Sequence, residues 1–279
     1  MNNRLMLVLV CMAFTPRASQ PQAAENAGTK VVIRNTFGSH PSYDTTYWMA
    51  DRKRMEFTRA VQRTKEDGSL QWVDETTIVH IVRCDLGQSF SLNLKAEEYS
   101  VAEYPPKPLT PGEMAAHGLD TAIAPQPTLR IEIATVDTGE RKKMFGHMAR
   151  HVITTTKQMP LEGSHTQAQQ TVRDGWYIDV DRRISCDPKP SAGSAFVTVG
   201  TAFVGGKGTM MERPEFVNIG TPETGFPVKE VRTTTSETTG VRRYSDSTNE
   251  SEVVQFEEGP LDPALFEVPP GFKRVVRSQ

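Results

Sequence analysis

Residues 77–95 read TIVHIVRCDLGQSFSLNLK and carry the pattern of two neighbouring strands. In the second half, Phe90, Leu92 and Leu94 alternate with polar residues, which is the period of a half-buried strand. The first half, residues 77–84, has apolar residues on both faces of the predicted strand, which favours a central position in a sheet. Gly87 lies between the two halves, where a hairpin needs positive φ, so we predict a β-hairpin.

The same signals recur along most of the chain. Further strands are predicted at 129–133, 147–156, 176–180, 226–235 and 252–256, and hairpin turns at 51–54 and 137–140. Hairpins that follow one another indicate an antiparallel meander and not βαβ units. We therefore predict a mainly β protein with one domain over residues 25–279.

Two stretches interrupt this pattern. Residues 105–127 are rich in proline, and residues 191–208 are rich in Gly, Ala and Ser. Strand patterning resumes after each, so a long surface loop within one domain is favoured over a domain boundary. A short helix is expected at 112–118, and a helix or a strand within 191–204.

The N-terminus has the layout of a secretory signal peptide. A short positive start at Arg4 precedes an apolar run to Phe14 and then a small, polar stretch that ends near Ala24. The run is shorter than the ~20 apolar residues that span a membrane. We expect residues 1–24 to be removed and the rest to be periplasmic or extracellular, with no transmembrane span. A buried N-terminal helix or a retained anchor is the alternative.

Removal of this segment changes both the charge and the cysteine count. Arg4 and Arg17 leave with it, so 32 − 2 = 30 basic residues face 34 acidic residues, a net charge of −4. This balance argues against nucleic acid as a partner. Cys84 and Cys186 remain, either as one disulfide or as two buried thiols. A bridge that closes a loop of about 100 residues is worth about 4–5 kcal/mol.

Motifs of catalysis and of phosphate binding are incomplete. The glycines at 205–208 resemble a phosphate loop, but Gly208 stands where Ser or Thr must follow Lys207. Ser164 and His165 lack the G-x-S-x-G context of a serine hydrolase. We predict no enzyme activity, no catalytic residue and no cofactor.

Possible ligand pairs for a metal are also incomplete. His147 and His151 share one strand face but lack the third ligand that zinc needs. Asp179 and Asp181 are predicted to share a strand face, which more often means a solvated surface than a Ca²⁺ or acid–base site. The sequence therefore indicates no metal. Asn249 begins an N-glycosylation acceptor motif, which matters only in an organism that modifies exported proteins.

The C-terminal residues 261–272, LDPALFEVPPGF, predict a docked tail. Asp262 is suited to cap a helical turn and Pro263 to begin it. Phe266, Val268 and Phe272 are apolar anchors, which implies an apolar surface that receives them.

Four segments together suggest a family: 81–93, 146–154, 174–179 and 261–272. Their order resembles a group of uncharacterised exported bacterial proteins and, more distantly, the lipoprotein carriers of the LolA, LolB and LppX type. The resemblance implies a strongly curved antiparallel sheet, an unclosed barrel with short helices or loops on its concave face. The lid helices of the carriers have no clear counterpart here, and residues 210–230 have no place in the family pattern.

By this resemblance, the concave face would bind a lipid, an acylated protein or another hydrophobic ligand. The candidate lining residues are Phe90, Leu92, Leu94, Leu129, Ile131, Ile133 and Met148. The simpler alternative is that they form the core face of the sheet.

Two other functions stay open at this point. A regulatory or scaffold module of the MucB/RseB type would bind a protein partner and use residues 105–127 as a contact loop. An envelope hydrolase would require the convergence of His147, His151, His165, Asp179 and Asp181.

Overall fold

The computed structural model describes residues 27–37, 40–65, 69–107, 110, 112–113, 126–164, 166–187, 201–203, 209–236 and 246–276. The expected signal peptide, His165 and the glycine-rich stretch at 205–208 lie outside these residues, as does most of the expected helix at 112–118 and of the stretch at 191–204. Among the described residues, no helix is long and apolar enough to cross a membrane.

Strands dominate the described chain, as the alternation predicts. The strands of its first half are β1 (Ala27–Phe37), β2 (His40–Met49), β3 (Arg52–Thr64), β4 (Leu70–Arg83), β5 (Gln88–Asn93) and β6 (Glu98–Glu103). The later strands are β7 (Leu129–Met144), β8 (His147–Pro160), β9 (Gln169–Ile178), β10 (Thr201–Phe203), β11 (Thr209–Met211), β12 (Pro214–Ile219), β13 (Phe226–Ser236), β14 (Ser247–Pro260) and β15 (Lys273–Arg274).

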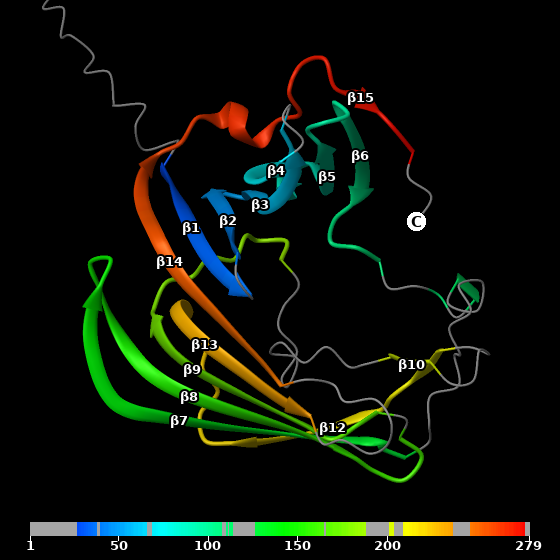
Figure 1. Ribbon diagram of the computed structural model, residues 1–279, viewed down its shortest axis with the longest axis vertical. Helices are drawn as coiled ribbons and strands as arrows, with labels where there is room; N and C mark the ends of the chain where they lie inside the picture. The colour runs from blue at the N-terminus through cyan, green and yellow to red at the C-terminus, as the bar shows by residue number, and fades with distance from the viewer. Residues whose placement is uncertain are drawn as a thin grey trace, which may run out of the picture.

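Thirteen of these strands form one sheet, in the order β12-β7-β8-β9-β13-β14-β1-β2-β3-β4-β5-β6-β15. Neighbours are antiparallel except at the two edges, where β12 runs parallel to β7 and β15 runs parallel to β6. The sheet is strongly curved and does not close, and Figure 1 shows it as an open C with β14 and β1 at the bend. The predicted fold class is confirmed. The strands β10 and β11 form a separate pair.

The hairpin predicted over residues 77–95 is confirmed. β4 and β5 pair from Ile78↔Asn93 to Arg83↔Gln88, and β4 has β3 on its other side. The connection is a 3-10 turn, η2 (Cys84–Leu86), followed by Gly87 with a φ of 61°. A left-handed residue at this point is what glycine permits at low cost.

The C-terminal tail docks on the sheet, as predicted. Asp262 accepts a hydrogen bond from the Ala264 backbone N–H at 2.9 Å and caps the 3-10 helix η3 (Pro263–Phe266). Phe266 is 0% exposed and packs with residues of β2, β4 and β5. This second core cluster consists of Met49, Val79, Ile81, Leu92 and Phe266, with Phe90, Leu94, Leu261, Leu265 and Phe272 packed against it. The tail lies outside the curve of the sheet (Figure 1).

Two further clusters complete the described core. The first joins Val31, Ala149, Ile178, Val228 and Val253, and it lies around the bend of the sheet. The third joins Leu129, Ile131 and Ile133 of β7, against which Phe216 of β12 packs. The core is thus distributed along the sheet.

Two sequence predictions are wrong. Residues 137–140 do not form a hairpin turn: they interrupt the β7–β8 register within β7, and the turn lies at Phe145 and Gly146. Asp179 and Asp181 do not share a strand face, because β9 ends at Ile178. In both cases the local residue types fit either structure, and pairing with the neighbouring strand decides.

Residues 179–187, which we call the crossing segment, leave β9 and run to the β4–β5 turn. Figure 1 shows this yellow-green segment inside the curve of the sheet. Its side chains contact β14 and β1 through Arg182 and β3 through Asp187. A loop of this kind, and not a helix, is what the described residues place on the concave face.

Candidate functional site

The concave face around the bend carries polar side chains from four strands. The register places Asn35 of β1 beside Ser251 of β14, Ser251 beside Glu230 of β13, and Glu230 beside Gly175 of β9. Residues opposite each other in a sheet share a face, so these positions look into the same concavity.

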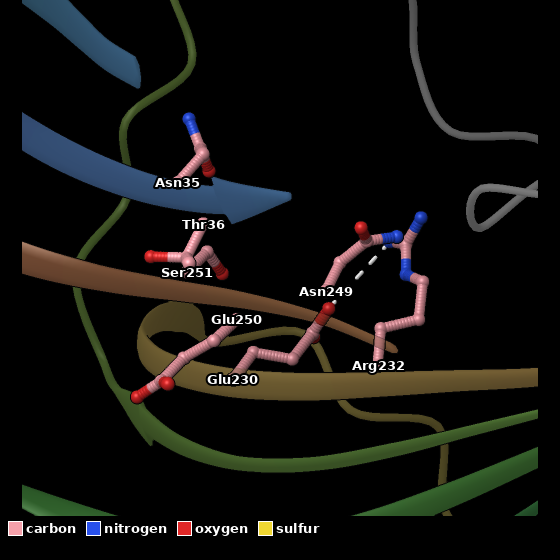
Figure 2. A pocket seen from close by; sticks show the side chains of 7 residues that line it. All are labelled: Asn35, Thr36, Glu230, Arg232, Asn249, Glu250 and Ser251. Carbon is pink, nitrogen blue, oxygen red and sulfur yellow. Dashed lines mark ion pairs between the residues drawn. The ribbon is translucent and has the colours of Figure 1, made fainter. Parts of the chain in front are cut away.

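A pocket of about 240 Å³ opens at this place (Figure 2), and we call it the polar pocket. It is lined by Asn35, Thr36, Glu230, Arg232, Asn249, Glu250 and Ser251. In Figure 2, Asn35, Asn249 and Arg232 point into the concavity, whereas Glu250 points away from it. The lining offers amides, hydroxyls and charges and no large apolar side chain.

Glu230 forms the base of this arrangement. Glu230 is only 7% exposed, and its carboxylate accepts a hydrogen bond from the Tyr177 hydroxyl at 2.8 Å. Arg232 and Arg173 lie 3.5 and 4.0 Å from it. Burial, and next the charge of Glu230, raise the pKa of Tyr177, so this hydroxyl stays a donor. A buried carboxylate needs such partners.

Asn249 and Arg232 supply unused hydrogen-bonding capacity. Asn249 Oδ1 is buried and has no hydrogen-bond partner among the described residues. The Arg232 side chain is 44% exposed while it faces Glu230. A carboxamide next to a guanidinium offers an acceptor and several donors, which suits an amide or another uncharged polar group. Because Asn249 lies in a paired strand, this position is part of the sheet.

The concave face continues onto the other arm of the C as a mixed polar and apolar surface. The register aligns Thr46, Met55, His80, Ser91 and Ser100 across β2 to β6 on the face of Val31 and Asn35. Trp48 and Phe57 share this face, and the Phe57 ring lies 5.6 Å from that of His80. Val79, Ile81 and Leu92 of the same strands face the tail instead.

The structure does not bring the seven lining candidates together. Phe90, Leu92 and Leu94 pack under the C-terminal tail, on the opposite face of the sheet. Leu129, Ile131 and Ile133 are buried in the third cluster, and Met148 is 61% exposed. Contact of any of them with a ligand stays a prediction.

The candidate hydrolase residues lie in separate pairs. Arg150 donates to Asp179 at 2.5 Å, and Arg183 donates to Asp181 at 3.0 Å. The His151 Nε2 atom is 2.6 Å from Asp174, and its ring stacks on Trp176 at 5.0 Å.

His147 and Ser164 have other neighbours, and His165 lies outside the described residues. His147 packs against Phe256 at 5.6 Å, and the Ser164 hydroxyl donates to Glu212 at 3.1 Å. Within the described ranges, no group of three His, Cys, Asp or Glu residues is arranged to hold a metal ion.

Among the described residues, Thr138, His151 and Asp174 form a chain of hydroxyl, imidazole and carboxylate contacts. Thr138 Oγ1 is 3.2 Å from His151 Nδ1. The same hydroxyl bonds the His151 carbonyl and accepts from the Glu140 backbone N–H, both at 3.2 Å. These contacts belong to the irregular part of β7, so the hydroxyl serves the local backbone.

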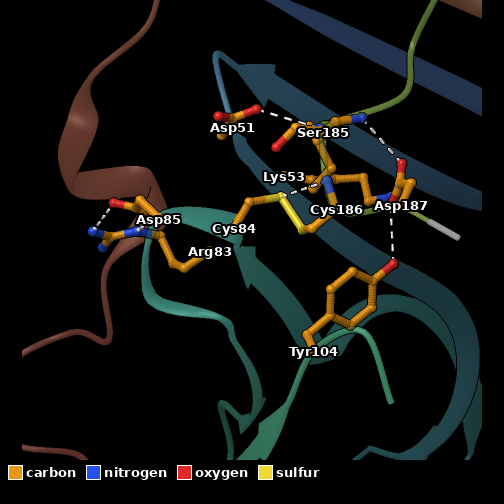
Figure 3. The surroundings of a disulfide bond; sticks show 10 residues. Asp51, Lys53, Arg83, Cys84, Asp85, Tyr104, Ser185, Cys186 and Asp187 are labelled. Carbon is orange, nitrogen blue, oxygen red and sulfur yellow. Dashed lines mark hydrogen bonds and ion pairs between the residues drawn. A yellow bond between two sulfur atoms is a disulfide. The ribbon is translucent and has the colours of Figure 1, made fainter. Parts of the chain in front are cut away.

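The disulfide confirms one of the two cysteine alternatives. Cys84 and Cys186 are bonded, with their Cα atoms 5.5 Å apart, and the bond attaches the crossing segment to η2 (Figure 3). Next to it, Lys53 Nζ donates to Asp187 at 2.7 Å and the Tyr104 hydroxyl donates to Asp187 at 2.9 Å.

These contacts shift two pKa values in opposite directions. Burial, and next the hydrogen bond to Asp187, raise the pKa of Tyr104 to about 12. Burial opposes ionisation of Asp187, but the bonds from Lys53, the Ile184 backbone N–H and Tyr104 outweigh it, so the Asp187 pKa lies below its ordinary value.

Sequence reasoning missed the polar pocket. Arg173, Tyr177, Glu230, Arg232 and Asn249 come from three strands, and none stands in a motif of binding or catalysis. Comparison of the chain with protein-family models and with curated proteins finds no match. The geometry of the concave face is therefore what indicates a function for this protein.

Proposed function

We propose that this protein is an exported, non-enzymatic binding module that holds a segment of a protein partner on its polar concave face. The observation that carries the proposal is the polar pocket, in which Arg232 and Asn249 present donors and an unused acceptor above the buried Glu230. A peptide group needs both kinds of partner.

The distribution of apolar side chains supports a polar partner over a lipid. Val79, Ile81 and Leu92 of β4 and β5 pack under the tail, and Leu129, Ile131 and Ile133 of β7 are buried in the third cluster. Binding of an acyl chain requires a pocket lined mostly by apolar side chains. Lipid binding, which the resemblance implies, is the competing proposal.

Two features support export. The signal-peptide layout of residues 1–24 predicts it, and the Cys84–Cys186 disulfide fits an oxidising compartment.

A photo-crosslinking amino acid in place of Asn35, which lines the pocket and points into the concavity, tests the proposal in cells of the native host. We expect ultraviolet light to join the protein to a polypeptide. The same substitution at Lys273, on the edge strand β15, is the control position. The substitution R232A together with N249A should reduce the captured polypeptide about tenfold or more, whereas R59A, at an exposed arginine outside the pocket, should not.

Capture of lipid alone at position 35 would favour the competing proposal. Equal polypeptide capture at positions 35 and 273 would show that the pocket has no part in binding.

A further inference from the structure

The crossing segment is connected to the sheet by side chains and one covalent bond, and not by a strand ladder. Its backbone–backbone hydrogen bonds in the described chain are local: Val180 donates to Ile178, and Asp187 donates to Ile184, each at 3.0 Å. The strands beneath it are instead joined by continuous ladders. The segment and the sheet therefore have different means of attachment.

Its middle rests on aromatic side chains around the bend of the sheet. The Arg182 guanidinium lies 4.7 Å from the ring centre of Phe256 and 5.8 Å from that of Trp48. It donates to Thr29 Oγ1 at 2.7 Å and to Glu258 at 3.3 Å. Val180 packs on the first core cluster, to which Trp48 and Phe256 also belong as partly buried members.

This middle contact has an electrostatic cost. Burial lowers the pKa of Arg182, and Arg182 Nε is buried without a hydrogen-bond partner among the described residues. Trp48 Nε1 beneath it is in the same condition. Polar groups in that state favour a conformation in which water reaches them. The middle of the segment therefore depends on its two ends to stay in place.

The ends are attached in different ways. At the start, Arg150 donates to Asp179, and the same guanidinium is paired with Glu223. At the far end, Cys186 is bonded to Cys84, and the Ser185 backbone N–H donates to Asp51 at 3.3 Å. Hydrogen bonds and ion pairs exchange readily with water, so the disulfide is the one contact of the far end that thermal motion does not open.

We propose that the crossing segment is a redox-controlled strap: the Cys84–Cys186 disulfide holds it over Trp48 and Phe256, and reduction of this bond releases it and exposes an aromatic surface inside the curve of the sheet. The step is a thiol–disulfide exchange. A dithiol reductant is oxidised to its own disulfide, and its two electrons and two protons convert the cystine to two thiols. Both cysteines are partly exposed, so a small dithiol has access.

This proposal does not rest on the proposed function. It concerns an aromatic surface next to the polar pocket, and it holds whether the partner is a polypeptide or a lipid.

Hydrogen exchange of the full chain, read by mass spectrometry, tests the strap. The probe is dithiothreitol, and thiol titration verifies complete reduction. We expect the amides of Ser185 and Cys186, which donate to Asp51 and to Cys84 Sγ, to exchange at least tenfold faster after reduction. The β7–β8 hairpin, distant from the disulfide in sequence, should keep its protection. The fluorescence of the apolar dye bis-ANS should rise at the same time.

Two variants separate the bond from its surroundings. C84S together with C186S should reproduce the reduced pattern without any reductant. D187N keeps the disulfide and weakens the adjacent ion pair with Lys53, so its exchange should stay close to that of the oxidised protein.

Unchanged exchange at residues 185–186 after verified reduction would overturn the proposal. Loss of protection in all strands at once would also overturn it, because the disulfide would then hold the whole fold and not the strap.

Discussion

Two segments cross the same sheet on opposite faces and are held by different sets of contacts. Thr29 bonds Arg182 of the crossing segment, whereas its neighbour Gly28 lies against Leu261 of the tail. The tail is held mainly by burial of Phe266, with Leu261 and Leu265 packed around it, and Arg83 and Arg54 add polar contacts to Glu267 and to the Leu265 carbonyl. The crossing segment buries Ile184 and packs Val180 on the first core cluster, but its contacts to the sheet also include a disulfide, ion pairs and a guanidinium on aromatic rings. We expect the tail to respond to changes in packing and the crossing segment to respond to redox state and pH.

The largest effect on stability is expected in the tail, at Phe266. F266A removes a fully buried ring and should lower the free energy of unfolding by about 3–5 kcal/mol. Urea denaturation measures the change. V276A, at a residue 96% exposed beyond the tail, is the control and should be neutral. A melting temperature equal to that of the wild type would mean that the tail is not docked in solution.

A smaller effect is expected where the tail touches β1. A Cβ atom at Gly28 would lie 2.5 Å from Leu261 Cδ1 and 2.5 Å from the Trp48 carbonyl oxygen. The second contact is with backbone and does not yield easily, so G28A should destabilise by about 1–3 kcal/mol. Its pairing partner Gly259 has no atom within 4 Å of such a Cβ, and G259A should be nearly neutral. Equal losses in both variants would contradict this packing.

On the concave side, the expected stability effects are smaller and depend on pH. The Tyr104 hydroxyl donates to Asp187, and its pKa is raised to about 12 from 10.0. A raised pKa contributes stability below pH 10, and this stability is lost as the pH rises through 12. Y104F should therefore cost about 1 kcal/mol at pH 8.

Denaturation at several pH values measures this difference between Y104F and the wild type. We expect it to shrink toward zero at pH 12. A difference that stays constant up to pH 12 would mean that the hydroxyl does not bond Asp187.

The smallest stability effect is expected in the polar pocket. Arg232 is one of three partners of the buried Glu230, so R232A should cost about 1 kcal/mol. Asn249 Oδ1 is unpaired, so N249A should change the free energy of unfolding by about 0.5 kcal/mol or less. Chemical denaturation measures it. Because the proposed partner contacts these residues, the same variants should lose binding. A loss of stability above about 2 kcal/mol would show that they act as core residues.

Features encoded within a few neighbouring residues were predictable from the sequence. The alternation of Phe90, Leu92 and Leu94 predicts β5, and Asp262 with Pro263 predicts the turn at η3. The number of cysteines left after removal of the predicted signal peptide suggests a disulfide without any knowledge of distance. In each case the deciding interaction lies between residues close in sequence, or follows from counting.

Features that depend on pairing between distant strands were not predictable. Residues 137–140, which include Gly139, have the composition of a turn. Only the register with β8 places them within a strand. The polar pocket needs Asn35, Glu230 and Asn249, which lie on three adjacent strands and are 249 − 230 = 19 to 249 − 35 = 214 residues apart in the chain. These residues come together only once β14 has paired with both β1 and β13. No local periodicity reports that order.

The central position of β1 and β14 has a consequence for how the chain folds. The register joins Ala27 to Pro260, so one edge of β1 stays unpaired until β14, which lies close to the C-terminal end of the described chain, has formed. Until then, β1–β6 and β7–β9 form two separate meanders with open edges at the future bend. Contacts between residues so distant in sequence slow folding and expose unpaired edges to aggregation. A chain synthesised from its N-terminus therefore completes this sheet only after synthesis is nearly finished, and we expect it to require protection from aggregation until that point.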